Sequence, residues 1–274
     1  MKKMGSPFYF RSAIDTGMAA KPYNCQVISF RMLTPTVFEL CYEPDSEFEF
    51  EGGQFLSVVI PGAGPKGRDL RRAYSIASHS EKRPVELCVK LVEEGPGTNY
   101  LYRLRPGDSF KGVAPYGDFT LKTGPERNAC LISTGTGIAP FRAMMMSESF
   151  KKKAPKRTLS LFGIREESEI VYEADFQALK ILGVEAVTAI SRPKMATLPS
   201  VNEPLNGSVR VKGRVTDYLK SSHFNLPLGE TDFYLCGSSA MIDEVSAYLK
   251  EKGVDKSAIR QEVYYKVPTE GISL

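Results

Sequence analysis

The sequence has few residues of the kinds that build metal centres and disulfide frameworks. Only two of its 274 residues are histidines, and its five cysteines include no Cys-x-x-Cys pair. Two isolated histidines are too few to suggest a metal centre or a catalytic triad. Most of the cysteines lie inside apolar runs, which fits buried, reduced thiols rather than a disulfide framework, a zinc site or an iron–sulfur cluster. We therefore expect no protein-bound metal.

Long apolar runs and a strong charge bias are also missing. No run approaches the roughly 20 residues that a membrane span requires. The N-terminal sequence MKKMGSPFYFRSAID contains no apolar stretch long enough for a signal peptide, so the expected location is the cytoplasm. The 36 basic and 32 acidic residues give a net charge of +4. This excess is too mild to indicate nucleic-acid binding, although it allows a local basic face for an acidic partner.

The first half of the chain has the pattern of an all-β domain. Residues 1–23 have no clear period and are interpreted as an N-terminal arm. From Asn24, short runs rich in β-branched and aromatic residues alternate with glycine, proline and acidic turns, which predicts an antiparallel barrel or sandwich over residues 24–124. One helix is expected at residues 98–104. The expected strands are Cys25–Met32, Val37–Tyr42, Gln54–Ile60, Arg72–Ala77, Val85–Val92 and Asp118–Leu121.

Residues 125–274 have a different pattern, in which strands alternate with helices. Alternation of this kind predicts βαβ units and a parallel sheet between two layers of helices. The segment Arg192–Lys212 has no period and is expected to form a long loop near the site. The expected strands are Ala129–Thr134, Thr158–Phe162, Glu185–Ile190 and Asp232–Cys236, and the expected helices are Phe141–Phe150, Glu173–Leu182, Val215–Ser221 and Ala240–Lys252.

The sequence ACLISTGTGIAPFRAMMM, from Ala129 to Met146, combines a buried strand, a glycine turn and a helix opened by Pro140. Free N–H groups at a helix start favour anions, and glycines let the backbone approach a diphosphate. The spacing is Gly-x-Gly-x-x-Pro rather than the Gly-x-Gly-x-x-Gly dinucleotide fingerprint. Alone, it leaves open both phosphate binding and an ordinary strand–turn–helix connection. Ligands of open parallel sheets bind beyond the carboxyl ends of the strands, where this turn lies.

Four segments, in this order, resemble the plant-type ferredoxin–NADP reductase family, which includes reductase components of bacterial oxygenases and various flavin reductases. The resemblance runs from about Asn24 to Lys266. It implies FAD on an N-terminal β-barrel and a nicotinamide dinucleotide on the C-terminal α/β domain. The four segments are Arg72-Ala73-Tyr74-Ser75, Cys88-Val89-Lys90 with Gly95-Pro96-Gly97-Thr98, the turn at Gly135, and Cys236-Gly237.

On the barrel, the resemblance implies that Arg72 neutralises the FAD diphosphate, for which its planar guanidinium is suited. Tyr74, next to Ala73, would pack along the isoalloxazine or ribityl chain, and Ser75 would hydrogen-bond near flavin N5. Without the resemblance, this strand could hold a surface arginine and a core tyrosine. Further contacts to FAD are implied for Val89, Lys90, Gly97 and Thr98, although Gly95–Thr98 could also be an ordinary turn with a threonine N-cap.

In the α/β domain, the resemblance implies that Thr136 and Gly137 meet the dinucleotide diphosphate and that Cys236, followed by Gly237, stands at the nicotinamide. On composition alone Cys236 would be an inert buried thiol.

Ser191 and Arg192 could bind the 2′-phosphate of NADPH, with Arg165 as a second contact. No acidic residue ends that strand to hold a free 2′-hydroxyl, which favours NADPH, although a Ser-Arg-Pro sequence also occurs in reductases that use NADH. Arg165 is equally compatible with a solvated loop residue.

The C-terminal sequence Glu262-Val263-Tyr264 resembles the end of the plastid-type enzymes. There the glutamate lies by the nicotinamide and the tyrosine stacks on the flavin, so the implied catalytic residues are Ser75, Cys236 and Glu262. This chain departs from that pattern, because Tyr265-Lys266 and eight further residues follow. A tyrosine lid would compete with nicotinamide for the flavin face and raise the apparent dissociation constant.

The expected activity is hydride transfer between NADPH and FAD, with single electrons passing between FAD and a separate ferredoxin or flavodoxin. Arg68, Arg71, Arg103 and Lys111 could form a basic frame for such a carrier. Three alternatives stay open at this point: a reductase component of an oxygenase or hydroxylase, a reductase of free flavins, and a non-catalytic module that senses flavin or nucleotide. The presence of Ser75, Cys236 and Glu262 argues against the last.

Overall fold

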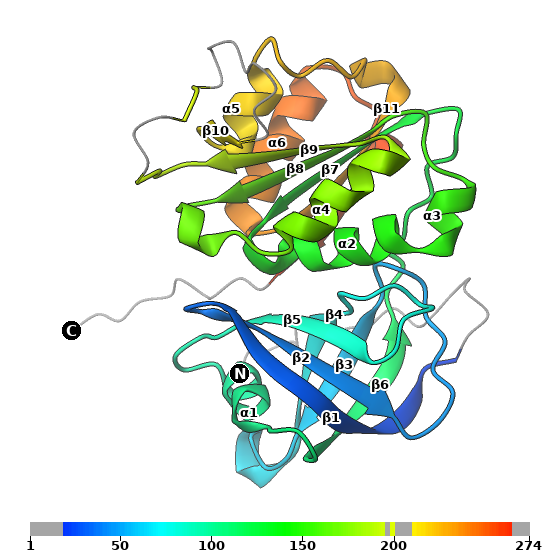
Figure 1. Cartoon of the computed structure of the whole chain (residues 1–274), viewed down its shortest axis with the longest axis vertical. Coiled ribbons are helices and arrows are strands. Elements are labelled where there is room, and N and C mark those ends of the chain that lie inside the picture. The colour runs from blue at the N-terminus through cyan, green and yellow to red at the C-terminus, as the bar shows by residue number, and fades with distance from the viewer. Residues whose placement is uncertain (1–18, 195–197, 201–209, 265–274) are drawn as a thin grey trace, which may run out of the picture.

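The computed structural model describes residues 19–194, 198–200 and 210–264, and two six-stranded sheets organise them (Figure 1). The first sheet is antiparallel, in the order β4-β3-β6-β1-β2-β5. Its ends meet where Ile76 bridges Leu87 and where the Ala77 N–H donates to the Glu86 carbonyl at 2.8 Å, so the sheet closes into a barrel. Its strands are β1 (Lys21–Thr34), β2 (Val37–Pro44), β3 (Phe55–Ile60), β4 (Leu70–Ser75), β5 (Val85–Lys90) and β6 (Ser109–Tyr116).

Side chains that alternate inward along these strands fill the barrel with aliphatic and aromatic groups. Phe38, Leu40 and Leu56 are fully buried in this cluster. One helix, α1 (Pro96–Arg103), packs against β3 and β4, and a short 3-10 turn, η1 (Pro65–Gly67), precedes β4. A proline at the start of α1 suits the first helical turn, where an N–H would have no partner.

The second sheet is entirely parallel, in the order β10-β9-β8-β7-β11-β12. Its strands are β7 (Asn128–Thr134), β8 (Thr158–Ile164), β9 (Val184–Ile190), β10 (Arg210–Lys212), β11 (Thr231–Gly237) and β12 (Ile259–Val263). The strand order reverses between β7 and β11. In an open parallel sheet, a reversal of this kind leaves a crevice at the carboxyl ends of the two strands.

Helices cover both faces of this sheet (Figure 1). The face toward the barrel carries α2 (Ile138–Met146), α3 (Glu148–Lys152) and α4 (Glu173–Ala178), and the other face carries α5 (Val215–Lys220) and α6 (Ser239–Glu251). None of the described helices combines the length and hydropathy that a membrane crossing requires. Short 3-10 turns complete the half: η2 (Gly135–Gly137), η3 (Glu167–Glu169), η4 (Leu179–Leu182), η5 (Leu228–Glu230) and η6 (Lys256–Ala258).

The two halves are packed together rather than merely linked. Val37, Ala77 and Cys88 of the barrel belong to the same apolar cluster as the residues beneath α2 and α4. The linker is also fixed, because the Tyr234 hydroxyl accepts hydrogen bonds from the Lys122 and Thr123 N–H groups at 2.9 and 3.2 Å. A continuous apolar contact and an anchored linker hold the barrel and the sheet in one arrangement.

The architecture confirms the expected antiparallel domain followed by a parallel α/β domain, with several corrections to individual elements. Asp118–Leu121 is not a strand, and the last barrel strand is β6. Strands β6, β10 and β12 were not predicted. The expected helix Phe141–Phe150 is two helices, because the Ser147 side chain accepts a hydrogen bond from the Phe150 N–H at 3.1 Å and starts α3 anew.

The ends and the long loop are only partly described. The first strand begins at Lys21, while residues 1–18 of the expected arm lie outside the described residues. Within the expected loop Arg192–Lys212, the last three residues form β10, and residues 195–197 and 201–209 lie outside the described part. The domain boundaries at residues 24 and 125 stay predictions.

Candidate active site

Side chains from three strand ends meet at the seam between the barrel and the α/β half. Ser75 ends β4, Cys236 lies near the end of β11, and Glu262 lies on β12. The Ser75 hydroxyl donates a hydrogen bond to Glu262 Oε1 at 3.3 Å, although 187 residues separate them in the chain. The structure thus brings together the three residues that the sequence marked as catalytic.

Tyr264 follows directly after β12 and closes this group. Its backbone N–H donates to the Gly237 carbonyl at 3.0 Å, which holds the end of β12 against the end of β11. Its hydroxyl is buried beside Ser75 and Cys236, and makes no hydrogen bond to any described residue. A buried hydroxyl without a partner is costly in a folded protein and often marks a position where a ligand group binds.

Burial controls the protonation of the acidic groups in the seam. The pKa of Glu262 is about 7 as the net result of three effects: burial raises it most, the hydrogen bond from Ser75 lowers it, and the negative charge of Asp118 raises it. Burial also raises the pKa of the Cys236 thiol well above its usual value, with a further contribution from Glu262. Cys236 is therefore a neutral thiol rather than a thiolate nucleophile. Glu262 can exchange a proton near neutral pH.

A second part of the site lies on the barrel, where α1 packs directly against β4. A methyl group placed on Gly97 would lie 2.4 Å from the Tyr74 hydroxyl oxygen and 3.0 Å from Arg72 Cγ, so a larger residue there would have to displace these side chains. The partial positive charge at the start of α1 therefore lies next to the Arg72 side chain. An arginine and a helix start that share one cradle fit the diphosphate of a dinucleotide.

The remaining barrel residues marked by the sequence occupy varied positions. Ala73 and Lys90 are exposed on β4 and β5. Val89 is 2% exposed and its side chain belongs to the barrel core, so only its backbone is left to contact a ligand. The Thr98 hydroxyl accepts a hydrogen bond from the Val92 N–H at 3.2 Å and thereby braces the loop before α1.

The glycine turn η2 and the end of β11 interlock at the crevice. A methyl group on Gly137 would lie 2.3 Å from the Cys236 carbonyl oxygen, and one on Gly237 would lie 2.4 Å from Thr134 Oγ1. Gly135 has a φ of +56° and is exposed, and Thr136 is half-buried at the rim. The helix α2 starts at Ile138, so Pro140 lies inside its first turn rather than opening it. A glycine turn followed by a helix start is the kind of backbone that offers N–H groups to a diphosphate.

The residues expected at the 2′-phosphate lie together at the ends of β8 and β9. The Arg192 N–H donates to the Arg165 carbonyl at 2.8 Å, and the Ser191 hydroxyl donates to the Ile164 carbonyl at 3.3 Å. Arg165 forms a salt bridge with Glu169, with 3.0 Å between Nη2 and Oε1. Arg192 is exposed. Of the two arginines, Arg165 is thus the one that already has a carboxylate partner.

Two charged residues near the seam were missed in the sequence. Asp118 lies where the sequence predicted the start of a strand, and its charge acts on Glu262. Nothing local in the sequence reveals this proximity. Arg142 lies in α2 and is 3% exposed. A single charge within the apolar run IAPFRAMMM was the available signal, since a buried charge needs partners.

Comparison with protein families assigns both halves of the chain. Residues 32–121 match the oxidoreductase FAD-binding domain, and residues 131–247 match the oxidoreductase NAD-binding domain. The two matches cover most of the barrel and most of the parallel sheet, without the greater part of β1 and without β12. They agree with the two cradles, one on each half, that meet at the seam.

Three relatives illustrate the range of similar proteins. Ferredoxin–NADP reductase B from Sorangium cellulosum is 37% identical over 58% of this chain and 65% of its own length. The phenol hydroxylase P5 protein from Acinetobacter pittii is 28% identical over 90% of this chain and 66% of its own length. A ferredoxin–NADP reductase from Pseudomonas aeruginosa is 30% identical over 85% of this chain and 90% of its own length. The match therefore spans just under two thirds of the first two relatives and most of the third.

We predict that Gly137→Ala destabilises the protein by about 1–3 kcal/mol, because the new methyl group would press on the fixed backbone of Cys236. Urea unfolding measures the loss. Gly229→Ala is the matched control, since a methyl group there would have no atom within 4 Å. Equal stability of the two variants would contradict the close approach of η2 to β11.

We also predict a pH-dependent stability difference that depends on Glu262. Its pKa is raised from 4.5 to about 7, so the folded state holds a proton that the unfolded state has lost between these values. Stability from this group is therefore complete below about pH 4.5 and is lost as the pH rises through about 7. Between pH 5 and pH 8, the wild type should lose on the order of 1–2 kcal/mol relative to Glu262→Gln.

Urea unfolding of both proteins at pH 5 and pH 8 checks the expected difference. Glu251→Gln, at an exposed position on α6, serves as a control that should parallel the wild type. A constant difference between wild type and Glu262→Gln at both pH values would show that Glu262 titrates in its ordinary range.

Proposed function

The chain belongs to the ferredoxin–NADP reductase family of flavin-dependent oxidoreductases, and from this premise we propose that it transfers hydride between NADPH and FAD and exchanges single electrons with a separate carrier protein. The observation that carries the proposal is the convergence of Ser75, Cys236 and Glu262 at the seam between an FAD-binding and an NAD-binding domain. A ferredoxin or a flavodoxin is the proposed carrier, and the cytoplasm is the proposed location.

On the barrel side, we assign the FAD diphosphate to Arg72 and to the start of α1 at Gly97 and Thr98. The close packing of α1 on Arg72 and Tyr74 supports this assignment, because it puts the Arg72 side chain next to the start of the helix. Tyr74 would line the flavin, with Ala73 beside it. Lys90 and the backbone at Val89 would contact the adenine side. Bound FAD supplies the redox chemistry, accepting a hydride and releasing single electrons.

On the α/β side, Thr136, Gly137 and Gly237 would hold the diphosphate of NADPH, and Cys236 would pack against its nicotinamide. A neutral thiol is suited to this position because it fills space without adding a charge next to the transferred hydride. The Ser75 hydroxyl and the Glu262 carboxyl form the polar part of the site. Their hydrogen bond gives them a route for moving a proton at the seam.

Tyr264 is proposed as a cover for the flavin face. Its buried hydroxyl without a partner and its position beside Ser75 and Cys236 support this role. A side chain in that position has to move before nicotinamide can enter, which lowers apparent coenzyme affinity by the fraction of closed site. The tail Tyr265–Leu274 lies outside the described residues.

A second candidate is a reductase that serves one oxygenase or hydroxylase. The similarity to a phenol hydroxylase component over 90% of the chain favours this reading. Both candidates use the same seam and the same two cofactors, and they differ only in the protein that receives the electrons. The acceptor therefore has to be found by measurement.

The test of the function is anaerobic reduction followed by transfer to a panel of acceptors. Purified protein loaded with FAD should be yellow and should lose its colour when NADPH is added without air. Ferredoxin and flavodoxin should then restore the colour faster than free flavins do. A yellow protein that NADPH leaves unchanged would instead be a binding module, while free flavins as the best acceptors would indicate a flavin reductase.

Coenzyme choice is predicted to depend on Arg192. Arg192→Ala should raise the dissociation constant for NADPH about 10–100-fold, because a charge-assisted bond to the 2′-phosphate is lost. The constant for NADH should change less than about threefold. Titration of the oxidised protein with NADP⁺ and NAD⁺ gives the same comparison without turnover.

The companion variant for this test is Arg165→Ala. Arg165 already has Glu169 as a partner, so its removal should weaken NADPH binding less than the removal of Arg192. Equal losses of NADPH and NADH affinity in Arg192→Ala would overturn the assignment of the 2′-phosphate site.

A further inference from the structure

One buried arginine crosses the seam between the two halves. Arg142 lies on α2 of the α/β half, and its side chain is 4% exposed. Its Nη1 donates to the Ala77 carbonyl at 2.8 Å and to Glu86 Oε2 at 2.6 Å, both on the barrel. Its Nε donates to Asp175 Oδ2 at 2.6 Å, on its own half. A single guanidinium thus joins groups from both domains.

The α/β half holds the Arg142 side chain from a second direction. The Tyr172 ring lies 4.2 Å from the guanidinium carbon, a distance at which the cation interacts with the aromatic face. Tyr172 has a φ of +58°, a left-handed conformation that is unfavourable for a bulky residue. It caps α4, whose first turn supplies Asp175. Backbone strain at this position therefore serves to put the ring and the carboxylate around Arg142.

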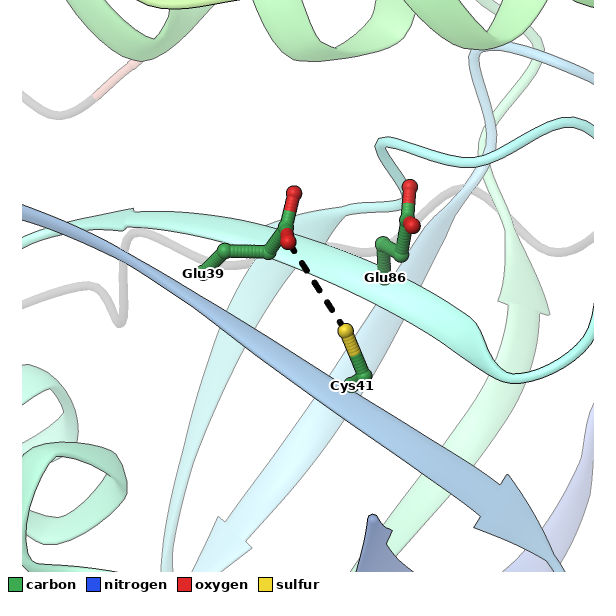
Figure 2. Close-up of side chains that lie close together, drawn as sticks. All are labelled: Glu39, Cys41 and Glu86. Carbon is green, nitrogen blue, oxygen red and sulfur yellow. Dashed lines mark hydrogen bonds between the residues drawn. The ribbon is translucent and has the colours of Figure 1, made fainter. Parts of the chain in front are cut away.

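The barrel side of this contact is a compact acidic cluster formed by Glu39, Cys41 and Glu86 (Figure 2). All three side chains are buried, and their ligand atoms lie within 4.8 Å of one another. In Figure 2 both carboxylates point toward the helices of the α/β half. Groups of this type could hold a metal ion, so the surrounding charges have to be counted.

The charge balance favours an ion-pair network over a metal site. Arg31 pairs with Glu39 at 2.7 Å, and Lys82 and Arg142 pair with Glu86 at 2.5 and 2.6 Å. Burial raises the pKa of Cys41, which keeps it a thiol and a poor metal ligand. When Asp175 is counted with Glu39 and Glu86, three carboxylates face three cations. A divalent ion would therefore add uncompensated positive charge.

Arg142 is also connected to both parts of the proposed active site. Ala77 lies two residues after Ser75 in an extended segment, so its carbonyl is rigidly linked to the end of β4. Helix α2 follows directly after the turn η2 that contains Gly137. Contact between Arg142 and Ala77 therefore joins the segment that carries Ser75 to the helix that carries the dinucleotide turn.

We propose that Arg142 is a positioning residue that fixes the distance between the flavin side and the nicotinamide side of the site, through its bonds to Ala77 and Glu86 across the seam. This inference rests on the proposed function. Arg142 touches neither cradle, so it acts on the alignment of the two cofactors and not on the binding of either. Misalignment by about 1 Å can cost on the order of 10²-fold in rate.

The test compares Arg142→Gln with the wild type in three measurements. The affinities for FAD and for 2′,5′-ADP, which report the two cradles separately, should change less than about twofold. The rate at which NADPH bleaches the flavin in one turnover should fall about 10–100-fold. Hydrogen exchange of the amides in segments 75–78 and 138–146 should become faster, while β8 and β9 stay as in the wild type.

Arg142→Lys and Arg157→Gln complete the set. Lysine keeps the charge but has no planar fork to reach both domains, so Arg142→Lys should recover only part of the rate. Arg157→Gln removes an arginine that pairs with Glu185 within the α/β half at an exposed site, and should change none of the three measurements. If Arg142→Gln does not fold, Glu86→Gln, which keeps the arginine and weakens its bond across the seam, replaces it.

The outcomes separate this inference from the proposed function. A wild type that NADPH does not bleach would overturn the proposed function, while hydrogen exchange would still test the link between the domains. An unchanged bleaching rate in Arg142→Gln would overturn the positioning role. A loss of FAD affinity equal to the loss of rate would overturn it too, because Arg142 would then support the barrel cradle alone.

Discussion

The packed seam between the barrel and the α/β half is the constraint on which the rest of the structure depends. The residues of the proposed site come from both halves, and the hydrogen bond that joins them across the described part of the seam, from Ser75 to Glu262, is 3.3 Å long. A bond of this kind contributes about 1 kcal/mol and cannot hold two domains in place. The shared apolar cluster and the buried contacts of Arg142 are the features that fix the arrangement. The meeting of Ser75 and Glu262 is thus a consequence of how the domains dock.

The same packing determines the electrostatics of the site. Cys236 belongs to the apolar cluster shared by the two halves, Glu262 meets Ser75 of the barrel, and burial is the main reason why both pKa values are raised. An opening of the seam would let water reach both groups and return them toward ordinary values. Domain docking therefore influences the proton affinity of both groups.

The sequence was most informative where structure follows from local pattern. Buried parallel strands such as β7 and β8 are largely apolar and have a glycine next to their last residue, so both the sheet and the crevice could be predicted. Strand β12 reads IRQEV, a polar edge strand with no such signal. In β6, Gly112 and Pro115 interrupt the alternation of apolar and polar residues that marks a strand. Gly112 lies where a side chain would contact Leu56 too closely. Contacts across the seam were invisible, since partners 56 and 187 residues apart leave no periodic trace.

A polar network inside an apolar interface has a specific effect on docking. Apolar surfaces can slide by an ångström or more with little change in buried area, because the hydrophobic effect is non-directional. A buried arginine is different, since a shift that breaks its bonds leaves a desolvated charge unpaired and costs about 3–5 kcal/mol. Arg142 contacts Glu86 and Ala77 on the barrel, and Asp175 and Tyr172 on the α/β half. Any shift of one half along the other that breaks these contacts is therefore unfavourable. In the proposed function, a flavin held by one half has to meet a nicotinamide held by the other, so the two halves need one fixed alignment. The cost of unpairing a buried arginine favours such an alignment, whereas a larger apolar seam alone would not.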